Sequence, residues 1–509
     1  EGVQIKILQT DTTIILQSGT QNVTRLIGNV RLYQDSVLMT CDSAILINEQ
    51  ELFAYDSVTI QQGDSLTAFA NYLAYNGATR KAFLEGEVVL LNGSRQLFTE
   101  RLDYDLNQKV AAYYSGATLV SDSMQLSSKR GYYYVDQEEA AFKDSVVVID
   151  PDFYLRTDTL QYSLSLSTVY FLAPTLISAD SSNIYCEAGY YDTQNGRAEF
   201  RQQAQYEKQG RRATAEVIRF VDQQDLYMLD GAAQVVDSNR LAQADTIRYF
   251  ELTDESYLTG HASYRDANRN IQDADEIYYN GNLGTYTTKG RARIQDAEQV
   301  LDADNVQFDD ASGQGLATGT VIWQDTSAHI AIRTDTARYR QDREYLKAAG
   351  GPNGRPELIS VFEDGDSLFL ASDTLFSRTL DTSRVDESRT LSAYRDARFY
   401  KSDFQGLCDS MVYTSSDSLF RLFGAPLLWS DSTQFKADTM RIQLANGAID
   451  RVYLVDNAII INQTHPQFFN QIKGKRITAY FKAGELDYLL VEGNAESVYY
   501  AKDDVGAYI

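Results

Sequence analysis

Apolar and polar residues alternate along most of the chain, which is typical of β-strands that bury one face. A recurring motif organises this alternation: a small residue, then Asp, Glu or a polar substitute, then an apolar residue two places further on. From Asp42 to Asp245 the motif recurs every 29 residues, and with looser spacing it continues to Asp438. A fixed period of this length predicts about fifteen repeats of one structural unit, rather than several globular domains.

A second motif lies half a repeat away and predicts the interior of the fold. It begins with a Gly, Asp or other small or polar residue, and apolar residues follow at the second and fourth positions. Because alternate residues of a strand share one face, both apolar positions are expected to point inward. The residues that we expect to line the interior are Val30, Leu32, Val58, Ile60, Val88, Leu90, Val146, Val148, Val235, Ile294, Val321 and Trp323.

The inward-facing positions change parity at the acidic residue of the first motif. Leu155 lies three positions before Asp158, whereas the apolar residues that follow lie two and four positions after it. Such a slip of one residue indicates a bulge or corner, where the strand passes from one sheet face to the other. We assign equivalent corners to Asp42, Asp158, Asp245, Asp304 and Asp438.

Turn signals such as Asn76-Gly77 fall about every 14 or 15 residues, so each repeat is expected to contain two long strands joined by tight turns. Bent strands that stack in register build two facing sheets around an apolar interior. The predicted fold is therefore all-β: an elongated antiparallel jellyroll solenoid of two-strand repeats.

The regularity of the spacing divides the chain into two regions. Residues 1–345 are predicted to be regular repeats, and residues 346–509 are predicted to continue the repeats with inserted loops. The insertions are placed at about 346–365, 378–390 and 462–475, where the spacing lengthens or the strand pattern is interrupted.

The net charge and the candidate catalytic and metal-binding residues argue against several classes of function. The net charge of −25 argues against nucleic-acid binding, because a phosphate backbone must be neutralised by cations. The three histidines lie in different repeats without the spacing of a metal site or triad, and Asp150-Pro151-Asp152 is not followed by a full set of oxygen ligands. A residue that turns a corner is needed in every repeat, whereas a catalytic pair of carboxylates occurs once. The recurring acidic residue is therefore better explained as a corner residue. We expect no catalytic residue, metal or cofactor.

The opening of the chain resembles the OstA-like family, which includes the lipopolysaccharide-transport protein LptA and the N-terminal domain of LptD. The resemblance lies in residues 3–47: an amphipathic first strand with Ile5 and Ile7, Gly28-Asn29-Val30 followed by Gln34, and the pair Cys41-Asp42. Both repeat motifs recur along nearly the whole chain, so the resemblance covers most of it, although this chain has about three times the rungs of a typical bridge protein.

The resemblance implies a β-jellyroll, or β-taco, whose interior residues form an apolar groove for the acyl chains of lipopolysaccharide. It also implies a periplasmic, non-enzymatic bridge between the inner and outer membranes, with a role in outer-membrane biogenesis. Its partners would be other lipopolysaccharide-transport proteins, or a second copy of this chain, joined by pairing of edge strands. Ile5 and Ile7 are the candidate docking residues of the N-terminal edge, which has a single charge at Lys6. Ser497–Tyr500 would form the other edge.

Two other classes of protein fit the repeat. An extracellular structural or adhesive β-solenoid would have a dry, closed interior. A carbohydrate-active β-helix enzyme would show one concentrated group of carboxylates, and it would not need a turn at every half repeat.

Overall fold

The computed structural model describes residues 4–501 except residues 20, 64–65, 122, 180, 268, 342–344, 353, 363–364, 380–387 and 483–484. The chain divides into two compact units. Unit 1 comprises Glu1–Ser238 and Thr246–Leu252, and unit 2 comprises Asn239–Asp245 and Thr253–Ile509. Strand β22 (Leu241–Phe250) thus has its first half in unit 2 and its second half in unit 1.

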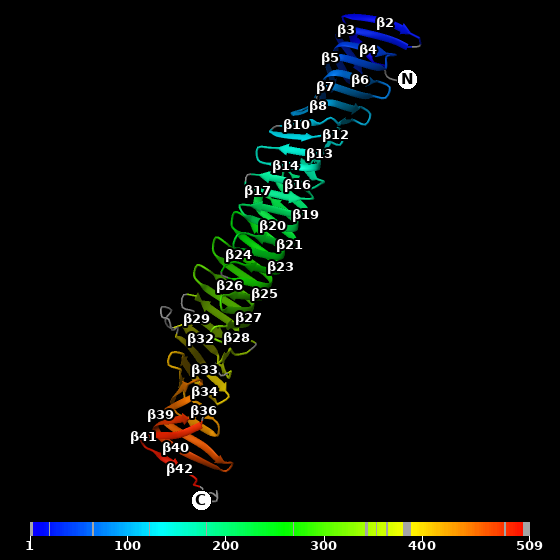
Figure 1. The fold of residues 1–509 in the computed structure, drawn as a ribbon. Coiled ribbons are helices and arrows are strands. Elements are labelled where there is room, and N and C mark those ends of the chain that lie inside the picture. The colour runs from blue at the N-terminus through cyan, green and yellow to red at the C-terminus, as the bar shows by residue number, and fades with distance from the viewer. Residues whose placement is uncertain are drawn as a thin grey trace. The chain divides into compact units, whose positions relative to one another are not determined.

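Unit 1 is a ladder of antiparallel strands that succeed one another in chain order (Figure 1). Between β8 and β19, four pairs of short strands take the place of long strands: β9 and β10, β11 and β12, β15 and β16, and β17 and β18. A single turn of 3₁₀ helix, Asp222–Gln224, follows β20. The strands are β1 (Lys6–Gln9), β2 (Thr12–Ser18), β3 (Gln21–Gln34), β4 (Val37–Ile47), β5 (Glu51–Gln62), β6 (Leu66–Asn76), β7 (Lys81–Asn92), β8 (Arg95–Asp105), β9 (Val110–Tyr113), β10 (Ala117–Ser121), β11 (Met124–Ser128), β12 (Arg130–Tyr134), β13 (Glu139–Ile149), β14 (Tyr154–Ser163), β15 (Thr168–Phe171), β16 (Thr175–Ala179), β17 (Ser182–Cys186), β18 (Ala188–Asp192), β19 (Arg197–Lys208), β20 (Arg211–Val221) and β21 (Leu226–Val236).

Unit 2 has the same antiparallel arrangement. Its strands are β23 (Glu255–Arg265), β24 (Asn270–Asn280), β25 (Thr285–Asp296), β26 (Gln299–Asp309), β27 (Gln314–Asp325), β28 (Ile330–Arg340), β29 (Tyr345–Ala349), β30 (Glu357–Val361), β31 (Ser367–Ala371), β32 (Thr374–Thr379), β33 (Arg389–Lys401), β34 (Phe404–Thr414), β35 (Leu419–Phe423), β36 (Leu427–Ser430), β37 (Thr433–Lys436), β38 (Thr439–Ala445), β39 (Ala448–His465), β40 (Phe468–Lys482), β41 (Glu485–Glu492) and β42 (Glu496–Val498). The prediction of an all-β antiparallel fold is confirmed. Within the residues that the structure describes, no helix is long and apolar enough to cross a membrane.

Each long strand bends near its middle, and the burial pattern records the bend. In β4, Val37, Met39 and Cys41 are buried, the parity changes at Asp42, and Ala44 is the next buried residue. The pairing of β4 with β5 shifts register at the same place. One strand therefore contributes one half to each of two facing sheets, and both halves turn their apolar side chains inward.

The partner residues at these corners have left-handed backbone conformations. Gly260 has φ of 76°, and a Cβ atom there would lie 2.3 Å from the Oδ2 atom of Asp245 on the adjacent strand. Glycine allows this conformation and leaves room for the carboxylate. Where the corner has no glycine, two consecutive residues such as Asp56 and Ser57 take positive φ values of 59° and 48°.

The structure places all five of the acidic residues assigned to corners beside these bends. Asp158 lies opposite the register shift between Lys143 and Val146. Donors on the following strand reach the other four carboxylates: Ser57 Oγ to Asp42 (3.0 Å), His261 Nδ1 to Asp245 (2.9 Å), the Thr320 N–H to Asp304 (2.8 Å) and Asn457 Nδ2 to Asp438 (2.8 Å).

The predicted insertions differ in outcome. Residues 350–356 separate β29 from β30, within the predicted 346–365 segment. Most of the segment 378–390 lies outside the described residues. The predicted interruption at 462–475 is wrong, because β39 and β40 continue through it as one long hairpin with Asn462 opposite Asn470. Backbone hydrogen bonds hold these polar strand ends, so the alternation of apolar side chains is not needed there.

The corner contact gives a stability prediction for Gly260→Ala. The left-handed backbone should cost about 1 kcal/mol, and the collision with Asp245 should add about 1–2 kcal/mol to the loss of unfolding free energy. Gly210→Ala is the matched control, because Gly210 has φ of 83° and no heavy atom within 4 Å of the added Cβ. Urea unfolding of both variants measures the difference. Equal losses would show that the contact with Asp245 is not a constraint.

Candidate functional site

The apolar interior is the candidate functional site, and most of the residues predicted for it are buried. Ten of the twelve are no more than 9% exposed, among them Val30 and Val321 at 1% and Leu90 at 9%. Ile60 and Val235 are half-buried. Burial alone does not distinguish a packed core from a binding groove, so the assignment of these residues to a groove stays a prediction.

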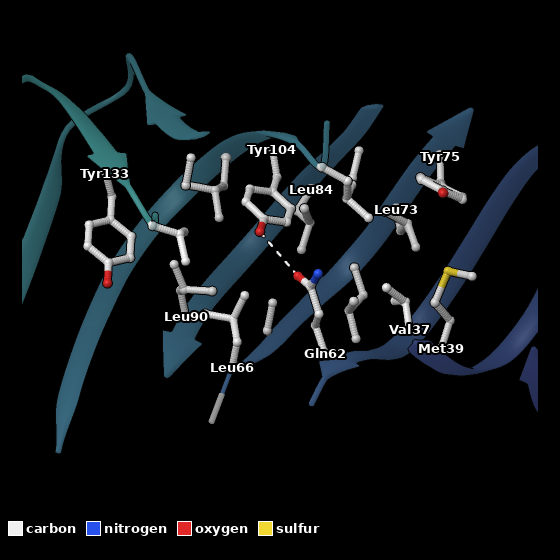
Figure 2. Close-up of a pocket in the computed structure, with 17 residues that line it drawn as sticks. Val37, Met39, Gln62, Leu66, Leu73, Tyr75, Leu84, Leu90, Tyr104 and Tyr133 are labelled. Atoms are coloured by element: carbon white, nitrogen blue, oxygen red, sulfur yellow. Dashed lines mark hydrogen bonds between the residues drawn. The ribbon is translucent and has the colours of Figure 1, made fainter. Parts of the chain in front are cut away.

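In the N-terminal part of unit 1 the interior is nearly filled. A cavity of about 30 Å³ lies between side chains that include Val37, Leu73 and Leu84. Figure 2 shows how these side chains surround it. A neighbouring cavity of about 60 Å³ is lined by residues of β7 to β14, among them Leu97 and Phe142. These volumes hold one or two water molecules and no acyl chain.

A much larger cavity of about 490 Å³ lies further along unit 1, between strands β11 and β21. Val148 and Leu155 line it from one side, and Phe171, Phe200 and Ile218 are also in its wall. Its volume is within the range of small-molecule sites, which are typically apolar clefts of about 300–1,000 Å³. Of the twelve predicted interior residues, Val148 is the one that lines this cavity.

Hydrogen bonds cross the open side of unit 1, which we call the rim: the strand ends and turns that lie away from the corners. Gln34 accepts a hydrogen bond from the Tyr75 hydroxyl at 2.5 Å. The Tyr104 hydroxyl donates to the Gln62 side chain at 3.1 Å (Figure 2). In the next rung Asn92 Nδ2 lies 2.8 Å from the Tyr133 hydroxyl. The partners are 41 or 42 residues apart, so each bond ties one sheet to the other.

These rim bridges stop at the large cavity. In the next three rungs the equivalent pairs are Ser121 and Tyr162, Asp150 and Tyr191, and Ala179 and Phe220. Within the described part of the chain, no hydrogen bond joins any of the three pairs. Serine and alanine are shorter than the asparagine and glutamine side chains of the bridged rungs, whereas Asp150 has the length of Asn92 and still does not reach Tyr191. The bridges resume with Lys208 Nζ, 2.6 Å from Glu251 Oε1.

The sequence motifs missed the rim, although its signal is present in the sequence. The tyrosines lie four residues after the acidic residue of the first motif, and their partners lie six residues after the start of the second motif. Each column is regular by itself. The tyrosines meet their partners only when the strands bend and stack, and the residue pattern of one strand does not show this.

Unit 2 contains a cavity of about 660 Å³, and its character is different. Phe362, Leu368 and Phe420 line it together with His329 and Arg389. Beside it, Arg389 Nη1 forms an ion pair at 2.7 Å with Asp325, which is 3% exposed. The mixed lining makes this cavity a weaker candidate for purely apolar ligands than the cavity of unit 1.

The cysteines lie in the core. Burial raises the pKa of Cys41 to about 11 and the pKa values of Cys186 and Cys408 to about 12. A buried thiol that remains protonated is a poor nucleophile and a poor metal ligand. Among the described residues, no three His, Cys, Asp or Glu side chains are grouped so that they could hold a metal ion.

The N-terminal edge differs from its prediction at Ile5. This residue is 3% exposed, and its N–H donates to the Glu49 carbonyl at 3.0 Å, so Ile5 is an internal residue and not a docking residue. The edge consists of β1 and β2, which both pair with β3. Ile7 lies in β1 and is 41% exposed.

Parts of the chain are similar to known proteins. Residues 3–158 match the sequence model of the family described as OstA-like protein, so this part of the chain is OstA-like and the resemblance is confirmed. A solved structure similar to part of the chain is LptH of Pseudomonas aeruginosa, described as the LptA homologous periplasmic component of the conserved lipopolysaccharide transport device. That match has 14% identity and a TM-score of 0.21, and it covers 25% of this chain and 82% of LptH. No curated protein matches the sequence.

The thiol environments predict low reactivity. At pH 8 only about one in ten thousand Cys186 thiols is ionised in the folded protein, because its pKa is raised to about 12. Labelling by a disulfide reagent should be at least about a thousandfold slower than in the urea-unfolded chain. Fast labelling of the folded protein would show that the cysteine positions open readily.

The same shift determines the sign of a pH effect on stability. The folded-state pKa of Cys186 lies above the unfolded-state value of about 8.5, so its contribution to stability is complete below pH 8 and decreases as the pH rises above that value.

Proposed function

We propose that this chain is a periplasmic bridge that binds the acyl chains of lipopolysaccharide in its interior and carries them between the inner and outer membranes. The observation that carries the proposal is the apolar cavity of about 490 Å³ inside unit 1. The OstA-like match of residues 3–158 supports the choice of lipopolysaccharide, and the cavity begins within that region.

The physical basis is transfer of acyl chains from water into an apolar interior. Each Å² of apolar surface removed from water contributes about 25 cal/mol, so a few methylene groups already give useful affinity. A lipid that moves along such an interior keeps its chains away from water. This function needs no catalytic group, and we propose that the chain is not an enzyme.

The unpaired edge of β1 and β2 supports assembly with other transport proteins. Lys6 is the one charged residue in these two strands. Ile7, Ile14 and Ile15 are 41%, 41% and 73% exposed. Edge strands without charge or proline pair readily with another sheet. The proposed partner is the sheet edge of another OstA-like protein or of a second copy of this chain.

The C-terminal edge has a different character. β41 and β42 both pair with β40, and β41 has carboxylates at Glu485, Asp487 and Glu492. Charged side chains on an edge strand discourage pairing. Ser497–Tyr500, predicted as a docking strand, includes the exposed Val498 and Tyr499 at 51% and 74%. We therefore propose docking first for the N-terminal edge.

A structural or adhesive solenoid is the alternative from another class. Such a protein would need no lipid, and its interior would be fully packed, as it nearly is around Leu73 and Leu84. Mass spectrometry of lipids that co-purify with the chain from a native envelope separates the two functions. Recovery of acylated saccharolipid favours the bridge, whereas a lipid-free protein favours the solenoid.

Val148→Glu tests the cavity as the lipid site. Val148 is 4% exposed and lines the cavity, so a carboxylate there would meet apolar surroundings and should lower the affinity for lipopolysaccharide at least about tenfold. Ile149→Glu is the matched control, because Ile149 is the next residue of the same strand and is 51% exposed. Both variants are titrated with labelled lipopolysaccharide. Equal affinity of the two variants would exclude the cavity as the site.

Ile15→Lys tests the N-terminal edge. A photoreactive aromatic residue at Ile7 should cross-link to a neighbouring protein in the native envelope, and Ile15→Lys should lower the yield at least about fivefold because charge blocks edge pairing. Leu166→Lys is the control, since Leu166 lies in a turn and is 61% exposed. An unchanged cross-link yield with Ile15→Lys would show that this edge does not dock.

A further inference from the structure

The large cavity of unit 1 has an opening that the rest of the rim does not have. On its N-terminal side Gln62 and Asn92 are bonded across the rim, and on its C-terminal side Lys208 is bonded to Glu251. Over the cavity, Asp150 and Ala179 occupy the bridging positions, and no described residue bonds to either side chain across the rim. The described side chains therefore do not tie the two sheets together across the rim at the cavity of about 490 Å³.

On the side of the cavity away from the rim, one corner is also interrupted. The corner between β15 and β16 contains Pro174, which has no N–H to donate to a ladder. The corresponding corners of β7 and β13 are continuous strand. A corner that is not held by strand pairing allows the sheets to lie further apart.

Carboxylates surround this opening. Asp150 and Asp152 lie in the turn after β13, Asp222 follows β20, and all three line the cavity. None of them forms an ion pair with a described residue. At two other places on the rim a carboxylate is paired, Asp35 with Arg80 at 2.8 Å and Glu251 with Lys208 at 2.6 Å.

Tyr191 lies in the cavity wall among these carboxylates. Burial raises the pKa of its hydroxyl, and Asp222, Asp150 and Asp152 raise that pKa further. A cation close to the hydroxyl would act in the opposite direction. The described side chains thus give the opening a negative potential above an apolar cavity.

We propose that this opening is a lateral portal for an amphiphile whose headgroup exposes a primary amine, with its acyl chains in the cavity and its ammonium group at Asp150, Asp152 and Asp222. The inference rests on the proposed lipid-binding function and names the class of headgroup. An ammonium group offers three donors to carboxylates that have no other cationic partner among the described residues.

A bare phosphate headgroup does not fit the same position. Its charge would lie beside three unpaired carboxylates, and like charges within a few ångströms disfavour one another. A phosphate esterified to an amine carrier is different, because the ammonium group can face the carboxylates. Tyr191, whose hydroxyl has no described hydrogen-bond partner, can then donate to a phosphate or sugar oxygen.

Two soluble short-chain phospholipids with identical acyl chains test the proposal. Phosphatidylethanolamine and phosphatidylglycerol displace a fluorescent fatty acid from the full-length protein, with EDTA present so that no divalent cation bridges phosphate to carboxylate. We expect phosphatidylethanolamine to bind about fivefold more tightly, as a few partly exposed charge pairs allow. Asp150→Asn, Asp152→Asn and Asp222→Asn combined should reduce this preference to less than about twofold.

A second triple variant removes the same number of negative charges away from the portal. Its substitutions are Glu100→Gln, Asp103→Asn and Glu138→Gln, all at exposed positions of unit 1. It should retain the full preference. If the portal variant does not fold, the wild-type protein still gives an answer, because the preference must weaken between about 50 and 500 mM salt as charge interactions are screened.

Different outcomes would overturn the amine portal and the proposed lipid-binding function. Equal binding of the two phospholipids, or a preference that the portal substitutions and salt leave unchanged, overturns the amine portal but leaves lipid binding in place. Failure of both phospholipids and of lipopolysaccharide to displace the probe, with Val148→Glu indistinguishable from the wild type, overturns the proposed function itself.

Discussion

The structure of each unit depends on the bend in the middle of every long strand. A strand has two faces, and a straight strand with one apolar face can build only one side of a core. By slipping one residue at the corner, each strand turns both of its halves inward and encloses an interior with the same strands that form its walls. The carboxylate at the corner and the glycine beside it are therefore constraints that the whole stack shares. Asp245 and Gly260, whose added Cβ would lie 2.3 Å from the carboxylate, show how little space the bend leaves.

The filling of the interior differs along unit 1, and so do the hydrogen bonds across the rim. Where Tyr75 and Tyr104 bond to glutamine side chains of the opposite sheet, the facing residues fill the interior almost completely. Asp150 and Ala179 take the same position beside the cavity of about 490 Å³, and no described hydrogen bond crosses the rim from either side chain. The same arrangement of bent strands thus contains a nearly filled stretch and a hollow stretch, and the two differ in the side chains at the strand ends.

The proposed bridge function is consistent with the apolar interior of unit 1. An amphiphile needs an apolar volume for its chains and an exit for its headgroup, and the cavity between β11 and β21 with its unbridged rim offers both. The carboxylates at that exit favour a positively charged headgroup, and the apolar lining alone would not make this distinction. The exposed isoleucines of β1 and β2 provide, independently, an edge through which an apolar interior can continue into another protein.

The repeat, the strand faces and the corners can be read directly from the sequence, because these features are local. Alternation records which side of a strand is buried, and the slip at Asp42 or Asp158 records the bend within the same strand. Hence the alternation alone assigns Val30, Val88 and Val321 to the interior, and each of them is 1% exposed. Features that join residues of different rungs come instead from tertiary packing. Ile5 is internal because Glu49 accepts its N–H, residues 462–475 form a hairpin because their backbones pair, and the cavity of unit 1 lies between strands that are far apart in the chain. Such contacts arise from stacking, and the pattern of one strand carries no record of its neighbour across the interior.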